Sequence, residues 1–178
     1  MFRQLKCPGF IAMLLLILTG CGSKTVPPLS LVPHVDLPRF MGDWYVIASI
    51  PTVIETTAHN AIESYRMAPD GTIATTFTYR DGSFQGPQKR YEPTGFVLDR
   101  QSNAVWGMRF IWPFKADYRI AWLSPDYSQT IIGREARDYV WIMACTPTIP
   151  DADYRTMLAF LNREGYDTTK IIKVPQQW

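Results

Sequence analysis

Few side chains in this sequence have the types and spacing that catalysis or metal binding requires. There are only two histidines, His34 and His59, which excludes a histidine-rich metal site within one chain. The sequence contains no Gly-x-Ser-x-Gly nucleophile elbow, no glycine-rich phosphate loop and no paired-cysteine metal motif. We therefore expect a protein that is not an enzyme and that holds neither a metal ion nor a cofactor.

Cys21 is the residue whose surroundings predict a specific chemical modification. Arg3 and Lys6 precede an apolar run, residues 10–18, that is too short to span a bilayer and has the form of an export signal. The following Leu18-Thr19-Gly20-Cys21 resembles the lipobox of bacterial lipoproteins. This resemblance implies that residues 1–20 are a signal peptide and that Cys21 becomes the acylated N-terminus. An ordinary secretory signal with a chance cysteine is the alternative.

The same resemblance implies where the chain is found. Three acyl chains would anchor Cys21 durably, whereas a single chain binds a membrane only marginally. Gly22 stands where an aspartate would retain an enterobacterial lipoprotein in the inner membrane, so we expect the outer membrane, on its periplasmic side. Prolines and serines in residues 21–33 predict a flexible tether that precedes the folded domain.

Cys145 is the cysteine that would remain free. Cys7 leaves with the signal peptide and Cys21 is acylated, so the mature chain can form no intrachain disulfide. No basic residue adjoins Cys145 in sequence, and we expect a small buried apolar side chain here, not a reactive thiol.

The composition is that of one folded domain without affinity for nucleic acid. Of 178 residues, 47% are hydrophobic and 13% aromatic, enough for a sizeable core. Removal of Arg3 and Lys6 would leave 16 basic against 16 acidic residues, with no cluster of positive charge. Because binding to phosphates requires such a cluster, we expect no nucleic-acid partner and a single domain over residues 34–178.

Runs of β-branched and aromatic residues recur between turn signals at intervals of about 8 to 12 residues, as in an antiparallel sandwich or barrel. Connectors such as Pro69-Asp70-Gly71 and Asp81-Gly82-Ser83 are typical turns. The pattern predicts eight strands, and closing them into a barrel would leave no exposed edge. They are expected at residues 44–50, 60–68, 72–80, 89–98, 104–112, 116–123, 130–134 and 139–145.

One amphipathic helix is predicted after these strands. Thr148 can cap its start, Asp151 and Asp153 complement the positive end of the helix dipole, and Gly165 favours its end. Apolar residues at helical spacing predict a face that packs on the outside of the sheet: Tyr154, Met157, Leu158 and Leu161. A short final strand over residues 170–174 is expected at a sheet edge.

Three segments, taken in order, resemble those of one known family. Residues 42–45 have the Gly-x-Trp opening of the first lipocalin strand, residues 118–127 form a strand that ends in an Asp-Tyr turn, and residues 138–144 lead into Thr146-Pro147. From residue 35 to residue 174 the chain is similar to bacterial lipocalins of the outer-membrane lipoprotein class, which are related to apolipoprotein D. The resemblance implies an all-β fold: an eight-stranded antiparallel up-and-down barrel with one C-terminal α-helix packed outside.

The resemblance also implies a closed barrel floor built around Gly42 and Trp44. In this family an arginine just before the Thr-Pro usually packs across that tryptophan, but here Cys145 occupies its place. A cysteine supplies neither the stacking surface nor the five donors of a guanidinium. Either another group closes the floor, or the floor is looser than in the family.

Aligning each strand with the family pattern assigns alternate side chains to the barrel interior. The residues expected to contact a ligand are Glu63, Tyr65, Thr75, Phe77, Trp106, Met108, Phe110, Tyr118, Ile120, Trp122, Trp141 and Met143. Such an aromatic, sulfur-rich interior is typical of a pocket for a small apolar molecule, although the rings could also simply fill the barrel. Glu63 is anomalous, because a carboxylate there must be paired, hydrated or protonated. A slip of one residue would place it in solvent.

These patterns and the resemblance predict a membrane-anchored lipocalin that binds a small hydrophobic ligand, such as a fatty acid or lysophospholipid, for lipid storage, transport or membrane maintenance. The alternative is a structural or assembly lipoprotein whose filled barrel binds protein partners. The expected partners are a lipid-like small molecule and, through the acyl chains, a membrane. A homodimer is left open, and the residues identify no particular ligand.

Overall fold

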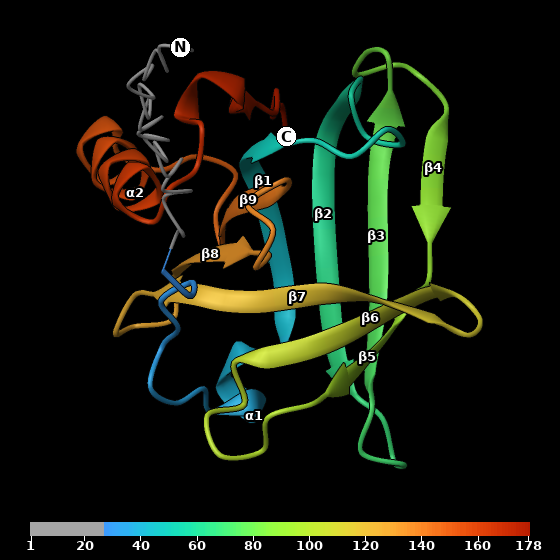
Figure 1. Ribbon diagram of the computed structural model, residues 1–178. Coiled ribbons are helices and arrows are strands. Elements are labelled where there is room, and N and C mark those ends of the chain that lie inside the picture. The colour runs from blue at the N-terminus through green and yellow to red at the C-terminus, as the bar shows by residue number, and fades with distance from the viewer. Residues whose placement is uncertain (1–26) are drawn as a thin grey trace, which may run out of the picture.

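The computed structural model describes residues 27–178, which form an antiparallel β-barrel with a helix against its outer wall (Figure 1). The predicted signal peptide and Cys21 lie outside the described residues. Within residues 27–178, no helix is both long and apolar enough to cross a membrane.

The barrel is one closed sheet. Each strand pairs antiparallel with its neighbours, and β1 also pairs with β9, which joins the two ends of the sheet. β4 and β5 together take one position in the barrel, so its wall has the eight positions that were predicted. The strands that form the wall are β1 (Gly42–Ile50), β2 (Ala58–Met67), β3 (Ile73–Asp81), β4 (Gln88–Tyr91), β5 (Thr94–Val97), β6 (Val105–Ile111), β7 (Phe114–Leu123), β8 (Gln129–Gly133) and β9 (Val140–Ala144).

The predicted strand over residues 89–98 is divided into β4 and β5. Pro93 lies in the break, because a proline has no N–H to donate to a sheet ladder. β5 pairs with both β3 and β6, whereas β4 pairs with β3 alone. The hydrogen-bonded sheet is therefore continuous from β3 through β5 to β6, but β4 has a paired strand on one side only.

The two ends of the barrel differ, and we call them the mouth and the floor. Ile50 pairs with Val140 and Gly133 also pairs with Val140, so the β1–β2 loop (residues 51–57) and the β8–β9 loop (residues 134–139) meet at the mouth. The β6–β7 turn lies at the same end. A four-residue helix that was not predicted, α1 (Leu37–Phe40), lies at the floor, and its Phe40 is fully buried.

Alternation along the strands produces two apolar cores, one inside the barrel and one between the barrel and α2 (Asp151–Arg163). Met157 and Leu161 of α2 are buried in the outer core, as predicted. The predicted cap at Thr148 is wrong, since the residue at the N-cap position is Pro150, which makes no capping bond. Gly165 follows the helix at a φ of 87°, a conformation that favours glycine.

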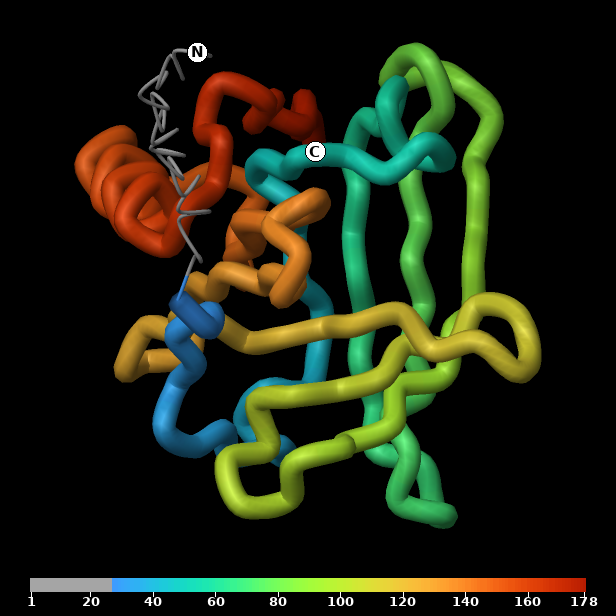
Figure 2. The backbone as a smooth tube through the Cα atoms, viewed as in Figure 1, coloured from blue at the N-terminus to red at the C-terminus, as the bar shows by residue number. Residues whose placement is uncertain are grey.

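The segment before α1 is held against the barrel, contrary to the prediction that the tether extends to residue 33. Leu29 is buried in the outer core, and the Val32 N–H donates to the Ile120 carbonyl. Figure 2 shows this blue segment running along the outside of the barrel to α1. Near the other terminus, the 3₁₀ helix η1 (Thr168–Lys170) leads into β10 (Ile172–Lys173), which pairs with β1, within the segment predicted as the final strand.

Candidate functional site

The barrel contains a cavity of about 600 Å³, a volume that includes its open mouth. Apolar atoms make up most of the surface of its wall, and polar side chains lie both near the opening and deeper, where Glu63 and Tyr118 are buried. The lining residues are Thr52, Ile54, Glu55, Glu63, Phe77, Met108, Phe110, Ala116, Asp117, Tyr118, Arg134 and Trp141.

Half of the residues predicted to contact a ligand line this cavity: Glu63, Phe77, Met108, Phe110, Tyr118 and Trp141. Five others are buried deeper, between the cavity and the floor: Tyr65, Thr75, Trp106, Ile120 and Met143. The predicted alternation is therefore confirmed for these eleven residues, but the floor half of the barrel is filled with side chains. Any ligand would occupy the mouth half.

The inward placement predicted for Trp122 is wrong. A β-bulge interrupts the pairing of β7 with β8 between Ile120 and Trp122, and one extra residue reverses the alternation. Ile120 is buried inside the barrel, whereas Trp122 packs against the outer core beneath α2. Trp122 therefore takes no part in the cavity.

Glu63 lies inside the barrel wall, which confirms the predicted register of β2. Its residue is 8% exposed, and it pairs with Phe77 on β3. Burial raises the pKa of the Glu63 carboxyl from 4.5 to about 7, with a smaller contribution from the negative charge of Glu55, whereas a hydrogen bond from Tyr65 opposes the rise. Burial therefore favours the protonated form of this carboxyl at a pH where an exposed glutamate is ionised.

Glu55 is a second cavity carboxylate, and the strand pattern missed it because it lies in the β1–β2 loop. Its oxygens each accept from the Trp141 Nε1 at 3.2 Å, and Oε1 also accepts from the Thr52 N–H and hydroxyl, both at 2.9 Å. Thr52-x-x-Glu55 has the Ser/Thr-x-x-Glu spacing by which a glutamate reaches back to a backbone N–H. That spacing was the signal that could have identified it.

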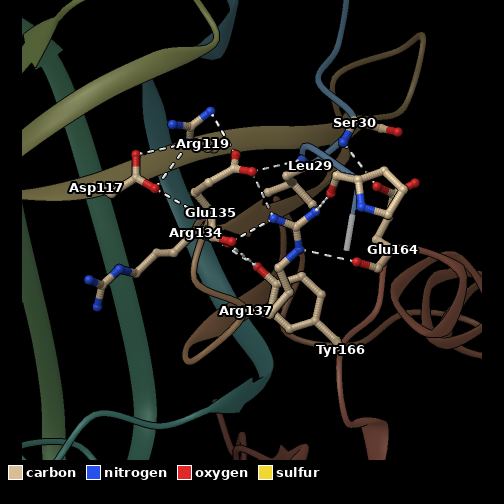
Figure 3. A network of polar contacts seen from close by, with 10 residues as sticks. Leu29, Ser30, Asp117, Arg119, Arg134, Glu135, Arg137, Glu164 and Tyr166 are labelled. Carbon is tan, nitrogen blue, oxygen red and sulfur yellow. Dashed lines mark hydrogen bonds and ion pairs between the residues drawn. The ribbon is translucent and has the colours of Figure 1, made fainter. Parts of the chain in front are cut away.

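Charged residues gather on the β8–β9 side of the mouth (Figure 3). Asp117 binds Arg119 at 3.0 Å, and Arg119 binds Glu135 at 3.0 Å. Arg134 lines the cavity and pairs with Asp138 at 3.2 Å, yet its buried Nε has no hydrogen-bond partner among the described residues. Asp117 and Arg134 were not predicted as lining residues, because nothing local shows that they converge at the mouth.

A pair of tyrosines closes the cavity toward the floor. The hydroxyls of Tyr65 and Tyr118 are hydrogen-bonded at 2.5 Å, and the ring of Trp106 stacks on Tyr118 with centroids 5.3 Å apart. Burial raises the pKa of both tyrosines well above the usual value, so both phenols stay protonated. The bottom of the cavity therefore presents neutral hydroxyls.

The floor is closed by aromatic stacking. Phe40 of α1 stacks on Trp44 with centroids 4.9 Å apart, and the Trp44 Nε1 donates to the Phe40 carbonyl at 2.9 Å. Gly42, with a φ of 122°, has the conformation that lets the chain turn from α1 into β1. The floor is thus closed without an arginine at position 145.

The expectation that Cys145 is buried is wrong. Cys145 follows the last residue of β9, is exposed, and its thiol donates to the Tyr127 carbonyl at 3.3 Å. Partial burial and the charge of Asp126 raise the pKa of the Cys145 thiol. The Arg39 guanidinium of α1 lies close by, over the Tyr127 ring at 4.1 Å. An arginine is therefore present at the floor end of the barrel, although it is not at position 145.

An up-and-down barrel with a filled floor, a helix on its wall and an apolar cavity open at one end defines a calyx-type protein that encloses a small molecule. The family model of the lipocalin-like domain matches residues 35–176, and the chain therefore belongs to the lipocalins, a family of proteins that bind small hydrophobic molecules. Glu63, the wall residues and the Trp44 floor all lie within the matched region.

Relatives and solved structures agree with this assignment. The chain is 29% identical to the outer membrane lipoprotein Blc of Escherichia coli K12 and 30% identical to that of Citrobacter freundii, in each case over 161 residues and 90% of both chains. Its fold is similar to that of the cockroach allergen Per a 4 (TM-score 0.63, 16% identity, 83% of this chain and 92% of the other). Its fold is also similar to that of lobster apocrustacyanin A1 (TM-score 0.63, 14% identity, 80% of this chain and 81% of the other).

Proposed function

We propose that this protein is a membrane-anchored lipocalin that binds a single-chain lipid, such as a fatty acid or lysophospholipid, in the mouth half of its barrel. The observation that carries this proposal is the cavity itself, which is walled by Phe77, Met108 and Trp141 and holds one buried carboxyl, Glu63, besides the charged groups at its opening. An acyl chain suits the apolar wall, and a polar head group suits the mouth, where the buried Nε of Arg134 has no hydrogen-bond partner within residues 27–178.

Glu63 distinguishes head groups in this proposal. When it is ionised, it repels a carboxylate and attracts a cationic group, and when it is protonated it does neither. Because its pKa is about 7, the preference between an anionic and a zwitterionic lipid should change within the neutral pH range. The protein would take up, store or hand over such lipids, and we assign it no catalytic role.

The anchor is part of the same proposal. Leu18-Thr19-Gly20-Cys21 supports cleavage before Cys21 and its acylation, and the relatives named outer membrane lipoproteins support attachment to the outer membrane. Gly22, in place of the aspartate that would retain a lipoprotein in the inner membrane, supports the outer membrane, and we propose that the protein faces the periplasm there. The Cys21→Ser variant should appear in the soluble periplasmic fraction or remain unprocessed, and an unmodified amine on wild-type Cys21 would refute the anchor.

Ligand extraction tests the binding proposal. Protein purified from bacterial membranes should release a single-chain lipid into organic solvent, detectable by mass spectrometry. Delipidated protein should then bind oleate or lysophosphatidylcholine at micromolar concentrations, about −8 kcal/mol, with a change in fluorescence that the Trp141→Phe variant reduces. Trp178→Phe is the matched control, since Trp178 packs on Tyr45 and does not line the cavity.

The alternative, a structural lipoprotein with a filled barrel, predicts the opposite results. No lipid would be extracted, neither lipid would bind delipidated protein at hundreds of micromolar, and a protein partner would copurify with the folded chain. The filled floor half of the barrel is compatible with this alternative, whereas the open cavity in the mouth half favours ligand binding.

A further inference from the structure

The β6–β7 hairpin carries large apolar side chains that face solvent. Phe110 is 51% exposed, Ile111 73%, Trp112 79% and Phe114 75%. A contiguous apolar surface of this kind on a soluble domain marks a site of contact with another apolar surface. Of these four residues only Phe110 lines the cavity, so the other three do not pack in the barrel interior.

The β1–β2 loop adds to this surface. Val53 is 86% exposed and Ile54 is 39% exposed, and Ile54 lines the cavity together with Phe110. The two loops therefore border one opening. We call their exposed apolar residues the apolar rim: Val53, Ile54, Phe110, Ile111, Trp112 and Phe114.

The hairpin extends beyond the end of its neighbouring strand β8. Pairing of β7 with β8 begins at Arg119 and Gly133, so the five residues 114–118 continue past the end of β8. At about 3.3 Å per residue they project by roughly 16 Å. Figure 1 shows the hairpin projecting at the right-hand edge of the molecule, away from α1.

The charges beside the hairpin indicate which kind of surface it contacts. The segment Arg109 to Lys115 contains two cations, at its two ends, and no acidic residue. Both cations lie over the Phe96 ring, Arg109 at 4.8 Å and Lys115 at 3.8 Å. Aromatic and aliphatic side chains flanked by cations are typical of segments that enter the interface of a bilayer with anionic lipids.

The N-terminal end of the described chain lies at the mouth as well (Figure 3). Arg137 of the β8–β9 loop donates to the Pro27 carbonyl at 2.7 Å, and the Leu29 N–H donates to Glu135 of the same loop at 3.3 Å. Pro27 lies six positions after Cys21, and six Cα–Cα steps span at most about 20 Å. An anchor at Cys21 would thus hold the mouth, and not the floor, close to the bilayer.

We propose that the mouth of the barrel lies against the anchoring membrane, with the β6–β7 hairpin inserted into the bilayer interface, so that the cavity exchanges its lipid directly with the bilayer. The orientation rests on the proposed anchor at Cys21, whereas the hairpin contact rests on the apolar rim. Two independent features, the exit of the chain beside the β8–β9 loop and the exposed apolar residues of the opposite loops, place the same end of the barrel at the membrane.

Fluorescence quenching by brominated lipids tests this contact. Acylated full-length mature protein, purified from bacterial membranes, is reconstituted on vesicles of phosphatidylethanolamine and phosphatidylglycerol with or without bromine on the acyl chains. Bromolipid should quench part of the tryptophan emission of the wild type, and this part should be lost in Trp112→Phe. It should be retained in Trp178→Phe, since Trp178 is also exposed (65%) but packs on the outer wall at Tyr45.

Each outcome decides the matter. Protein that floats with the vesicles but has the same quenched fraction in wild type and Trp112→Phe would overturn the membrane contact and leave the anchor intact. Protein that does not float at all would refute the anchor and the contact together. A Trp112 that is shielded from bromolipid by a second copy, seen as a cross-linked dimer that Trp112→Asp abolishes, would make the hairpin a dimer interface and overturn the proposal.

Discussion

Replacing Glu63 by glutamine should change how the stability of the barrel depends on pH. In the unfolded chain this carboxyl ionises near 4.5, but in the folded barrel only near 7, because burial penalises its charge. Between these values the unfolded state releases a proton that the folded state keeps, so the wild type loses stability as pH rises. The difference of about 2.5 between the two pKa values corresponds to about 3 kcal/mol, fully lost above pH 7 and regained below 4.5.

Glu63→Gln removes this titration while nearly keeping the shape of the side chain. The variant should match the wild type near pH 4 and exceed its free energy of unfolding by up to about 3 kcal/mol near pH 8. Carboxyls whose pKa values are lowered, such as those of Asp99 and Asp126, change stability in the opposite direction but equally in both proteins. The difference between the two curves therefore isolates Glu63.

Urea denaturation of delipidated protein from pH 4 to pH 9 measures this difference. Glu92→Gln is the matched control, because Glu92 is exposed and pairs only with exposed Arg90, and such a surface ion pair contributes little to the free energy of unfolding. Parallel curves for Glu63→Gln and wild type would show that folding does not shift the pKa of the Glu63 carboxyl, and the reasoning from its burial would be refuted.

Four further results are expected. Wild-type affinity for oleate should rise as pH falls through about 7, whereas Glu63→Gln should bind oleate tightly already at pH 8; calorimetric affinities that do not differ between the two proteins would contradict a cavity role for Glu63. Arg134→Gln should weaken oleate binding by roughly tenfold or more, the value of a hydrogen bond to a charged group, and leave an uncharged monoacylglycerol unaffected; equal losses for both would mean that Arg134 only shapes the mouth. Phe40→Ala should lower the free energy of unfolding by about 3–5 kcal/mol because it removes the ring that covers Trp44, and a loss below 1 kcal/mol in urea titrations would show that the floor does not depend on it. Cys145 should react with maleimide in the folded protein, more slowly than a free thiol because its pKa is raised, and complete protection would show that it is buried.

Local sequence patterns predicted most of the barrel. Strand positions and the α2 helix follow from alternation and helical spacing, which act over a few neighbouring residues. The inward faces of β2, β3 and β9 were assigned by aligning that alternation with the lipocalin pattern. The inward position of Glu63 was predicted in this way, although burial removes water from a carboxylate and is therefore unfavourable. The Leu18–Cys21 motif, read from sequence alone, stays a prediction about residues outside the described structure.

Only the tertiary structure decided the features that depend on contacts between distant segments. The bulge that turns Trp122 outward arises where β7 must pair with β8 and also pack beneath α2. Glu55 enters the cavity because the β1–β2 loop folds back onto Trp141 of β9, and Cys145 is exposed because β9 ends one residue earlier. The chain path from Pro27 along the wall could not be predicted from the sequence either, since the hydrogen-bond partners of Pro27 and Leu29 lie 110 and 106 residues away. A period of two or 3.6 residues determines which face a side chain takes, but only the packed barrel determines which faces meet.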